Sequence, residues 1–174
     1  SGNYTLSLAG APTTTADITA GTSAPEIANN APTGVVATAV WMNGNLTSTG
    51  GAPTTVWVFW GASAGGTNFT SWANTNDMGS RATGTLTTNV TGLTPGATYY
   101  YTFYATNSAG HAWATPATNF TTAKLTPSFS GLTASQSTNY GATNVTLGGT
   151  LSAAGPYYPT NGEPVTITIN GNVQ

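Results

Sequence analysis

The sequence predicts an all-β protein made of antiparallel β-sandwich modules in tandem. Hydrophobic and polar residues alternate most clearly over residues 97–107, with the period of two that is typical of a β-strand. Short runs rich in β-branched and aromatic residues recur along the chain, and Gly, Pro, Asn and Ser separate them. No window of 11 residues carries a helical apolar stripe with capping residues.

The clearest strand, residues 97–107, follows a Pro-Gly turn and has two distinct faces. The face expected in the core carries Tyr99, Tyr101, Phe103 and Ala105. The face expected outside carries Tyr100, Thr102, Tyr104 and Thr106. Because the strand is followed by a Ser-Ala-Gly turn, residues 111–122 are expected to return as its antiparallel partner.

The central part of the chain, residues 25–123, is expected to form one complete sandwich. Its predicted strands are residues 26–29, 37–46, 54–60, 84–90, 97–107 and 111–122. Residues 71–80 are compatible with either a short edge strand or a long loop closed by Trp72.

The first 24 residues are interpreted as the last strand of a preceding domain, followed by a linker. Tyr4, Leu6 and Leu8 alternate with polar residues, so residues 4–8 read as one strand. Residues 13–24 are rich in Thr, Ala and Gly, as linkers are. A single strand is not stable alone, so its partner strands must lie elsewhere.

Residues 124–174 read as the start of another domain. Strands are expected at 129–134, 144–152 and 164–170, with a hairpin turn at Asn170-Gly171. This region resembles the first half of a bacterial immunoglobulin-like repeat. The resemblance rests on Leu132-Thr-Ala-Ser-Gln136, Tyr140-Gly141, Leu147-x-Gly-Thr-Leu151 and Pro159-x-Asn161-Gly162-Glu163-x-Val165. The domain is therefore expected to be incomplete.

The central region resembles the fibronectin type III-like repeats of large secreted bacterial proteins. The residues that carry this resemblance are Leu46-Thr-Ser-Thr-Gly-Gly-Ala-Pro53, Val56-Trp-Val-Phe-Trp-Gly61, Leu93-Thr-Pro-Gly96 and Tyr104-Ala-Thr-Asn-Ser-Ala-Gly110. The resemblance implies a structural corner of Leu93, Pro95 and Tyr99, in which the tyrosine hydroxyl bonds back to the corner backbone. In one departure from that pattern, Trp41 is expected on the outer face, between the inward Val40 and Met42.

The charge pattern argues against several classes of function. Charged residues make up 3% of the chain, which has a formal net charge of -2 and only two basic residues. Such a chain has no basic surface for nucleic acid or anionic membranes, and no apolar run is long enough to insert into a membrane. The absence of cysteine excludes thiol catalysis and is compatible with an extracellular, secreted protein.

Catalytic and metal sites have few candidate residues, so no enzyme activity and no cofactor are expected. His111 is the single histidine, and it would need Asp17 or Asp77 beside it to support a nucleophile. Zinc is excluded by the lack of ligands. The weak calcium candidates are Asn74, Asn76 and Asp77, for which a solvated turn is the preferred interpretation.

Aromatic residues give the sequence its best candidate for a binding surface. The residues expected on this surface are Trp41, Trp57, Phe59, Tyr100, Tyr104 and Trp113. Exposed flat rings stack on sugars, so these residues suggest a polysaccharide-binding platform. The preferred alternative is that the rings pack on an adjacent module or beneath residues 71–80.

The function expected from the sequence is a non-catalytic structural or adhesive segment of a large extracellular modular protein. Its partners would be neighbouring modules or identical subunits, with a carbohydrate-binding module as the alternative function. The preferred interpretation of the two incomplete ends is a piece of a tandem array. In a second hypothesis, Tyr4, Leu6 and Leu8 of one subunit complete the half-domain of the next and build a filament.

Overall fold

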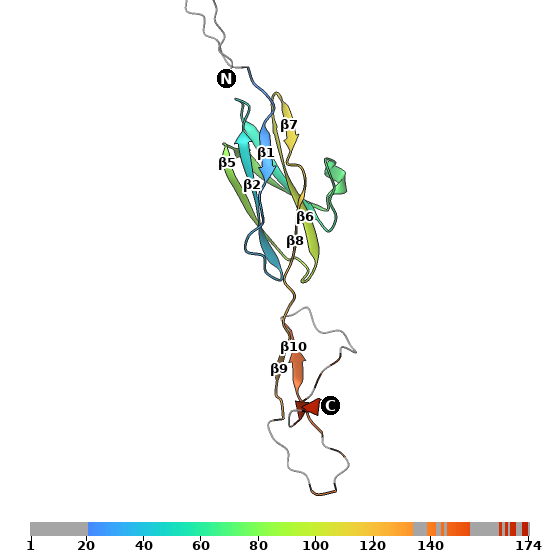
Figure 1. Ribbon diagram of the computed structural model, residues 1–174. Coiled ribbons are helices and arrows are strands. Elements are labelled where there is room, and N and C mark those ends of the chain that lie inside the picture. Colours follow the sequence, from blue (N-terminus) through green and yellow to red (C-terminus); the bar gives the residue numbers. More distant parts are fainter. Residues whose placement is uncertain are drawn as a thin grey trace, which may run out of the picture.

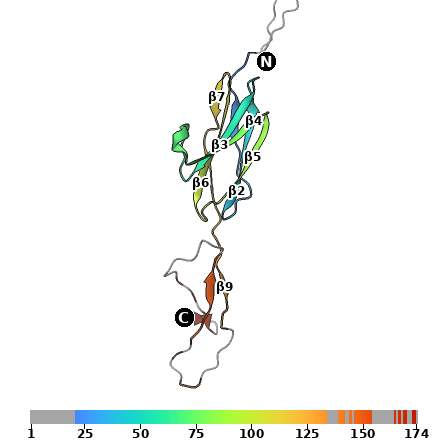
Figure 2. The same ribbon diagram turned by 180° about the vertical axis from the view of Figure 1, so that it is seen from behind.

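Two antiparallel sheets face each other and form a β-sandwich between Glu26 and Thr121. The computed structural model describes residues 21–133, 139–141, 144, 146–153, 164, 166, 168–169 and 172–173. Figures 1 and 2 show the sandwich from opposite sides, with strands that run along its long axis. The predicted all-β, antiparallel sandwich class is thus confirmed.

The first sheet has three strands in the order β1-β2-β5. They are β1 (Glu26–Asn29), β2 (Ala39–Ser48) and β5 (Gly84–Thr91). Residues of β2 alternate between the core and the outer face. Val40 and Met42 are fully buried, whereas Trp41 is 45% exposed. The sequence prediction that Trp41 faces outward is therefore confirmed.

The second sheet has five strands, with β4-β3-β6-β7 in order and β8 paired to the other end of β6. These strands are β3 (Thr54–Gly61), β4 (Asn74–Arg81), β6 (Thr98–Asn107), β7 (Gly110–Trp113) and β8 (Thr118–Thr121). The open question about residues 71–80 is answered by β4, an edge strand. A short 3-10 helix, η1 (Phe69–Ser71), precedes it.

The prediction of one continuous strand over residues 111–122 was wrong, because β7 and β8 are separated by residues 114–117. Pro116 cannot donate a backbone hydrogen bond, so it does not continue a ladder. At this break the side-chain amide of Asn29 replaces the ladder hydrogen bonds, because its Nδ2 donates to the carbonyl oxygens of Ala114 and Pro116, both at 2.8 Å.

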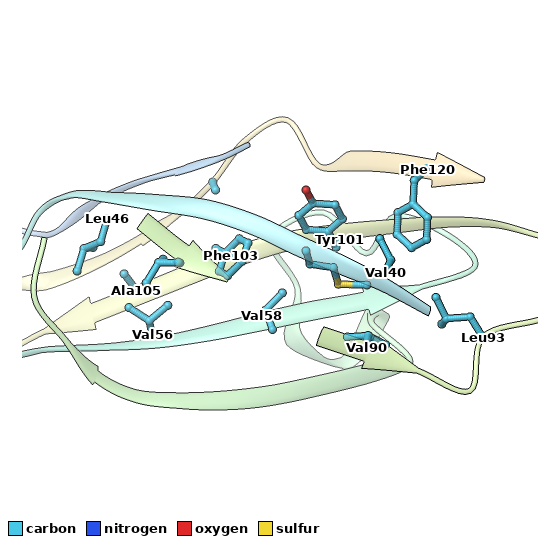
Figure 3. Packing of buried hydrophobic residues seen from close by; sticks show 13 residues of the cluster. Val40, Leu46, Val56, Val58, Val90, Leu93, Tyr101, Phe103, Ala105 and Phe120 are labelled. Carbon is cyan, nitrogen blue, oxygen red and sulfur yellow. The ribbon is translucent and has the colours of Figure 1, made fainter. Parts of the chain in front are cut away.

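The core between the sheets contains the inward side chains of both (Figure 3). Its fully buried members include Val40, Met42, Val56, Val58, Tyr101, Phe103 and Ala105. The inward face predicted for residues 97–107 is confirmed for Tyr101, Phe103 and Ala105. Gly44 is required in this core, because a Cβ there would lie 2.6 Å from the Phe103 ring.

The chain enters the sandwich at one end and leaves it at the other (Figure 1). At the entering end, the side-chain amide of Asn107 donates to the carbonyl of Ser23 at 2.7 Å. At the leaving end, Thr122 donates from its backbone N–H to the Ala97 carbonyl at 3.0 Å. Asn107 and Ala97 flank opposite ends of β6, so about 30 Å of strand separates the two attachments.

Residues beyond the sandwich form short paired strands in the part that the structure describes. Strand β9 (Ser128–Ser130) pairs with β10 (Thr150–Ser152), and β11 (Thr168–Ile169) pairs with β12 (Asn172–Val173). The strand predicted over 144–152 is shorter than expected, because residues 146–149, which include two glycines, are not in a strand. Tyr4, Leu6 and Leu8 lie outside the described residues.

Candidate aromatic site on the outer face

An aromatic cluster covers the outer face of the second sheet, away from the main core. The ladder places Trp57 of β3 opposite Tyr104 of β6, which in turn lies opposite Trp113 of β7. Phe59, two residues after Trp57, shares the same outer face. Four of the predicted surface residues are thus brought together: Trp57, Phe59, Tyr104 and Trp113.

These rings pack on one another and do not form the flat exposed platform predicted from the sequence. The centroids of Tyr104 and Trp113 are 4.7 Å apart, and those of Phe59 and Trp113 are 5.2 Å apart. Phe59 and Tyr104 are only 6% and 9% exposed, so neither offers a free ring face. The platform is corrected to a second, smaller core, to which the partly buried Tyr100 also contributes.

Trp41 does not belong to this cluster, which corrects the grouping predicted from the sequence. It lies on β2 of the first sheet, with its side chain on the outer face of that sheet. The two outer faces of a sandwich point in opposite directions. Trp41 instead pairs with Thr33 and lies close to Gly34.

Phe69 of η1 covers part of the cluster, and sequence reasoning missed it. Its ring centroid is 4.9 Å from Tyr104, in an edge-on arrangement, and also 4.9 Å from Trp113. Figure 1 shows this segment, in green, projecting beside β6. The alternative in which residues 71–80 cover the rings identified the correct region of the chain, but the covering ring comes from residue 69.

The segment that carries Phe69 is fixed by local contacts. Asn68 caps η1, since its Oδ1 accepts hydrogen bonds from the backbone N–H and the hydroxyl of Thr70. The indole of Trp72 donates to the Gly66 carbonyl at 3.1 Å, and its side chain is buried. A Cβ at Gly65 would lie 2.7 Å from the Trp72 ring, so glycine is required for this close approach.

An open hollow of ≈ 390 Å³ lies beside Phe69, and its lining is largely apolar. It is lined by Trp57, Phe59, Phe69, Thr75, Tyr104 and Thr106. The aromatic members form most of its lining, while the two threonines come from β4 and β6 on either side of β3. Asp77 is the residue opposite Trp57 in the ladder, so it stands on the same outer face.

The predicted calcium candidates lie in the edge strand β4, so the solvated turn expected for them was wrong. Asn76 donates its amide to Thr88 Oγ1 at 3.3 Å, whereas Asp77 Oδ1 accepts from the Gly79 N–H at 2.7 Å. Asn74 donates its amide to the Trp60 carbonyl. Within the described part of the chain, no three His, Cys, Asp or Glu residues gather where they would hold a metal.

His111 and Asp77 are not placed to act together. His111 belongs to β7 and Asp77 to β4, with β3 and β6 between them. Strands are about 4.8 Å apart in a sheet, so roughly 14 Å separates these two strands. The imidazole of His111 is exposed and lies 5.7 Å from the Tyr104 ring centre. Asp17 lies outside the described residues.

The corner of Leu93, Pro95 and Tyr99 is held by a side-chain bond. Tyr99 Oη accepts a hydrogen bond from the backbone N–H of Thr94 at 3.1 Å. Leu93 is buried in the core, whereas Pro95 is partly exposed at the turn. The hydroxyl therefore bonds back to the corner backbone, as the resemblance implied.

Comparison with known proteins gives few matches. No protein-family model and no curated protein matches the chain. Among solved structures, it is similar to the sensor domain of the anti-sigma factor RsgI4 of Pseudobacteroides cellulosolvens. A short form of that domain is 17% identical, covers 59% of this chain and 98% of its own, and has a TM-score of 0.43.

Two further structures of that sensor domain give comparable values. The long form is 18% identical, covers 66% of this chain and 97% of its own, and has a TM-score of 0.38. The solution structure is 19% identical, covers 83% of this chain and 94% of its own, and has a TM-score of 0.40. Similarity this low carries no functional information, so the site is interpreted from its own residues.

Tyr101 is an ionisable side chain that is fully buried in the core. Burial disfavours the charged phenolate and raises the pKa of Tyr101 above its ordinary value. Its hydroxyl also donates to the carbonyl of Asn30.

No helix in the described residues is long and apolar enough to span a membrane.

Proposed function

We propose that this chain is a non-catalytic spacer segment of a large extracellular modular protein. The observation that carries this proposal is that the chain enters and leaves the sandwich at opposite ends. Joined through such ends, modules follow one another in a line, and each one adds about the length of its strands. The neighbours in that line, or identical subunits, are the proposed partners.

Hydrogen bonds at both ends suit a module that has to keep its neighbours apart. Ser23 is held from two sides, since its N–H donates to the Gly50 carbonyl at 2.9 Å and its carbonyl accepts from Asn107. At the other end, Thr122 Oγ1 donates to the Thr94 carbonyl at 2.7 Å. Fixed attachments at both ends transmit orientation from one module to the next, which a flexible end would not do.

Two features support a fibronectin type III-like identity for the sandwich. Its strands divide into β1-β2-β5 and β4-β3-β6-β7, the second sheet being completed by β8. The hydroxyl of Tyr99 bonds to the corner that precedes β6. A bacterial immunoglobulin-like repeat is the proposed identity of the following region, residues 124–174. Fold alone does not define a role, so the spacer proposal rests on the positions of the ends.

The chemistry of the surface fits a location outside the cell. The chain contains no cysteine and has only six charged residues, with Thr, Asn and Gly supplying its polarity. No basic patch is available for nucleic acid, and His111 lacks a neighbouring carboxylate on its strand or on β6. These features support a role without catalysis, a cofactor or nucleic acid.

Replacing the sandwich within its native protein tests the spacer proposal. In-frame deletion of residues 25–123 should impair the surface attachment of cells that carry the protein. Substitution by an unrelated β-sandwich of similar length, with its ends also at opposite poles, should restore attachment. A replacement that behaves like the deletion would show that the sandwich acts through its own surface, and the spacer proposal would fail.

Filament formation by strand exchange is a separate proposal and has its own test. The strand predicted at Tyr4, Leu6 and Leu8 would have to add to the sheet of another subunit. Polymerisation measured by light scattering should then rise with concentration and disappear after removal of residues 1–9. Equal polymerisation with and without these residues would exclude them as the exchanged segment.

A further inference from the structure

Phe69 is a large apolar side chain that the protein holds partly in solvent. It is 49% exposed, although three aromatic rings contact it from below. The Asn68 cap and the hydrogen bond between Trp72 and Gly66 fix the segment that carries it. A ring positioned in this way is preorganised, so little conformational entropy is lost when a ligand contacts it.

The hollow beside Phe69 combines ring surfaces with hydroxyl groups. Trp57 lines the hollow and is partly exposed, while Thr75 and Thr106 supply hydroxyls from β4 and β6. The Thr75 side chain is exposed on the edge strand, so its hydroxyl is accessible. Thr106 donates to the Gly110 carbonyl at 3.0 Å and still has lone pairs that can accept.

Charge narrows the chemical class of the ligand. None of the six side chains that line the hollow carries a charge at neutral pH. Asp77, on the same face as Trp57, is exposed and keeps one carboxylate oxygen free of the bond to Gly79. A carboxylate accepts hydrogen bonds from hydroxyl groups and repels anions. The site therefore matches a neutral ligand rich in hydroxyls.

We propose that this hollow binds a sugar ring of a neutral polysaccharide. The apolar face of the ring would stack on Phe69 and Trp57, and its hydroxyls would bond to Thr75, Thr106 and Asp77. This proposal goes beyond the spacer function, which requires no ligand. It also differs from the flat platform predicted from the sequence. The main stacking surface is the exposed ring of Phe69, whereas Phe59 and Tyr104 on the sheet beneath it are buried.

The size of the hollow favours a sugar over a protein partner. A volume of ≈ 390 Å³ lies within the range of roughly 300–1,000 Å³ that is common for small-ligand sites. A stable protein interface buries about 800 Å² on each partner, which six lining residues do not provide. A sugar ring in a longer polysaccharide would occupy the hollow and leave the rest of the ligand in solvent.

Nuclear magnetic resonance titration of the whole chain tests this assignment. The probes are cellohexaose, xylohexaose and mannohexaose as neutral ligands, with hexagalacturonate as the anionic comparison. At least one neutral probe should shift the indole N–H signal of Trp57 saturably and leave that of Trp41 unchanged. Hexagalacturonate should bind more weakly than the best neutral probe, because Asp77 repels it.

Three variants separate binding from folding. Phe69→Ala should weaken the best neutral probe about tenfold, since it removes the stacking wall. Trp41→Ala is the matched control, because Trp41 is similarly exposed on the opposite face and should leave affinity unchanged. Thr75→Ala, at an exposed position, should also weaken binding. It replaces Phe69→Ala as the test variant if Phe69→Ala lowers the thermal midpoint of unfolding.

Three results would overturn the assignment. The first is the absence of a saturable shift at Trp57 with all three neutral probes at millimolar concentrations. The second is an affinity that survives both Phe69→Ala and Thr75→Ala. The third is self-association in sedimentation experiments that Phe69→Ala abolishes, which would assign the hollow to a second copy. None of these results bears on the replacement test of the spacer function.

Discussion

Asn29 Oδ1 accepts a hydrogen bond from the backbone N–H of Phe103 at 3.0 Å and so joins the edge of one sheet to the centre of the other. Asn29 belongs to β1, whereas Phe103 lies in β6 at the point where its partner changes from β7 to β8. The same side chain donates to the carbonyls of Ala114 and Pro116. One amide thus satisfies three backbone groups at the break.

Substitution of Asn29 should destabilise the sandwich strongly. Asn29→Ala removes its three bonds to the backbone and a fourth to Thr102 Oγ1, and it leaves the partly buried N–H of Phe103 without its partner, so the free energy of unfolding should fall by about 2–3 kcal/mol. Denaturant unfolding gives this value directly. Asn89→Ala, at an exposed position of β5, is the control and should change stability by less than about 0.5 kcal/mol. Equal effects of both substitutions would refute this role for Asn29.

A methyl group at Gly44 should not fit beneath Phe103. Gly44→Ala places a Cβ 2.6 Å from that ring and 3.0 Å from the Ala28 carbonyl, so unfolding should become easier by about 1–3 kcal/mol. In a double-mutant cycle, Phe103→Leu should recover part of the loss, because the smaller side chain gives way. Strict additivity of the two substitutions would contradict the proposed clash.

The corner hydroxyl of Tyr99 should make a small contribution to stability. Tyr99→Phe removes the acceptor of the Thr94 N–H, which is exposed and can bond to water instead, so the loss should be about 0.5–1.5 kcal/mol. Tyr100→Phe, on the other face of the same strand, is the matched control. Chemical denaturation of both variants measures the difference, and an equal loss would remove the corner bond as its cause.

Stability should be nearly independent of pH from about pH 4 to pH 9, because few ionisable groups exist to exchange protons on unfolding. Above pH 10.0 it should fall. The raised pKa of Tyr101 means that the folded protein keeps this proton after the unfolded chain has released it. Stability from this group is therefore complete below pH 10.0 and is lost as the pH rises toward the folded-state pKa.

Denaturant midpoints measured across the pH range check both the constant stability between pH 4 and pH 9 and the decline above pH 10.0. In Tyr101→Phe, the decline above pH 10.0 should be shallower, although the variant is less stable below pH 10.0 because it loses the bond to Asn30. A steep change between pH 4 and pH 9 would contradict the expected pH independence. An unchanged alkaline decline in Tyr101→Phe would show that Tyr101 does not cause it.

The sequence was sufficient to predict the parts of the fold that depend on local periodicity. Alternation placed Val40, Met42, Tyr101 and Phe103 in the core, because successive side chains on a strand point to opposite faces. The break between β7 and β8 was not predictable, since it depends on Asn29, more than 80 residues earlier in the chain.

The sequence predicted most of the rings that form the candidate site, but not how they pack. Trp57, Phe59, Tyr104 and Trp113 were identified because they alternate with inward residues. Burial of these rings was the preferred alternative, but the ring that covers them was not predictable, because it depends on where residues 65–72 pack against the sheet. Phe69 gave no periodic signal, and only the nearby Gly65, Gly66 and Trp72 hinted at a closely packed turn.

The mass of the native polypeptide tests the central claim most directly, because a spacer segment must belong to a longer chain. The cell-surface and secreted fractions of the source cells should be separated on a denaturing gel and analysed by mass spectrometry before any proteolysis. The spacer account predicts peptides of this sequence in a polypeptide much larger than 17.5 kDa. A secreted polypeptide of about that mass, with nothing larger, would contradict it.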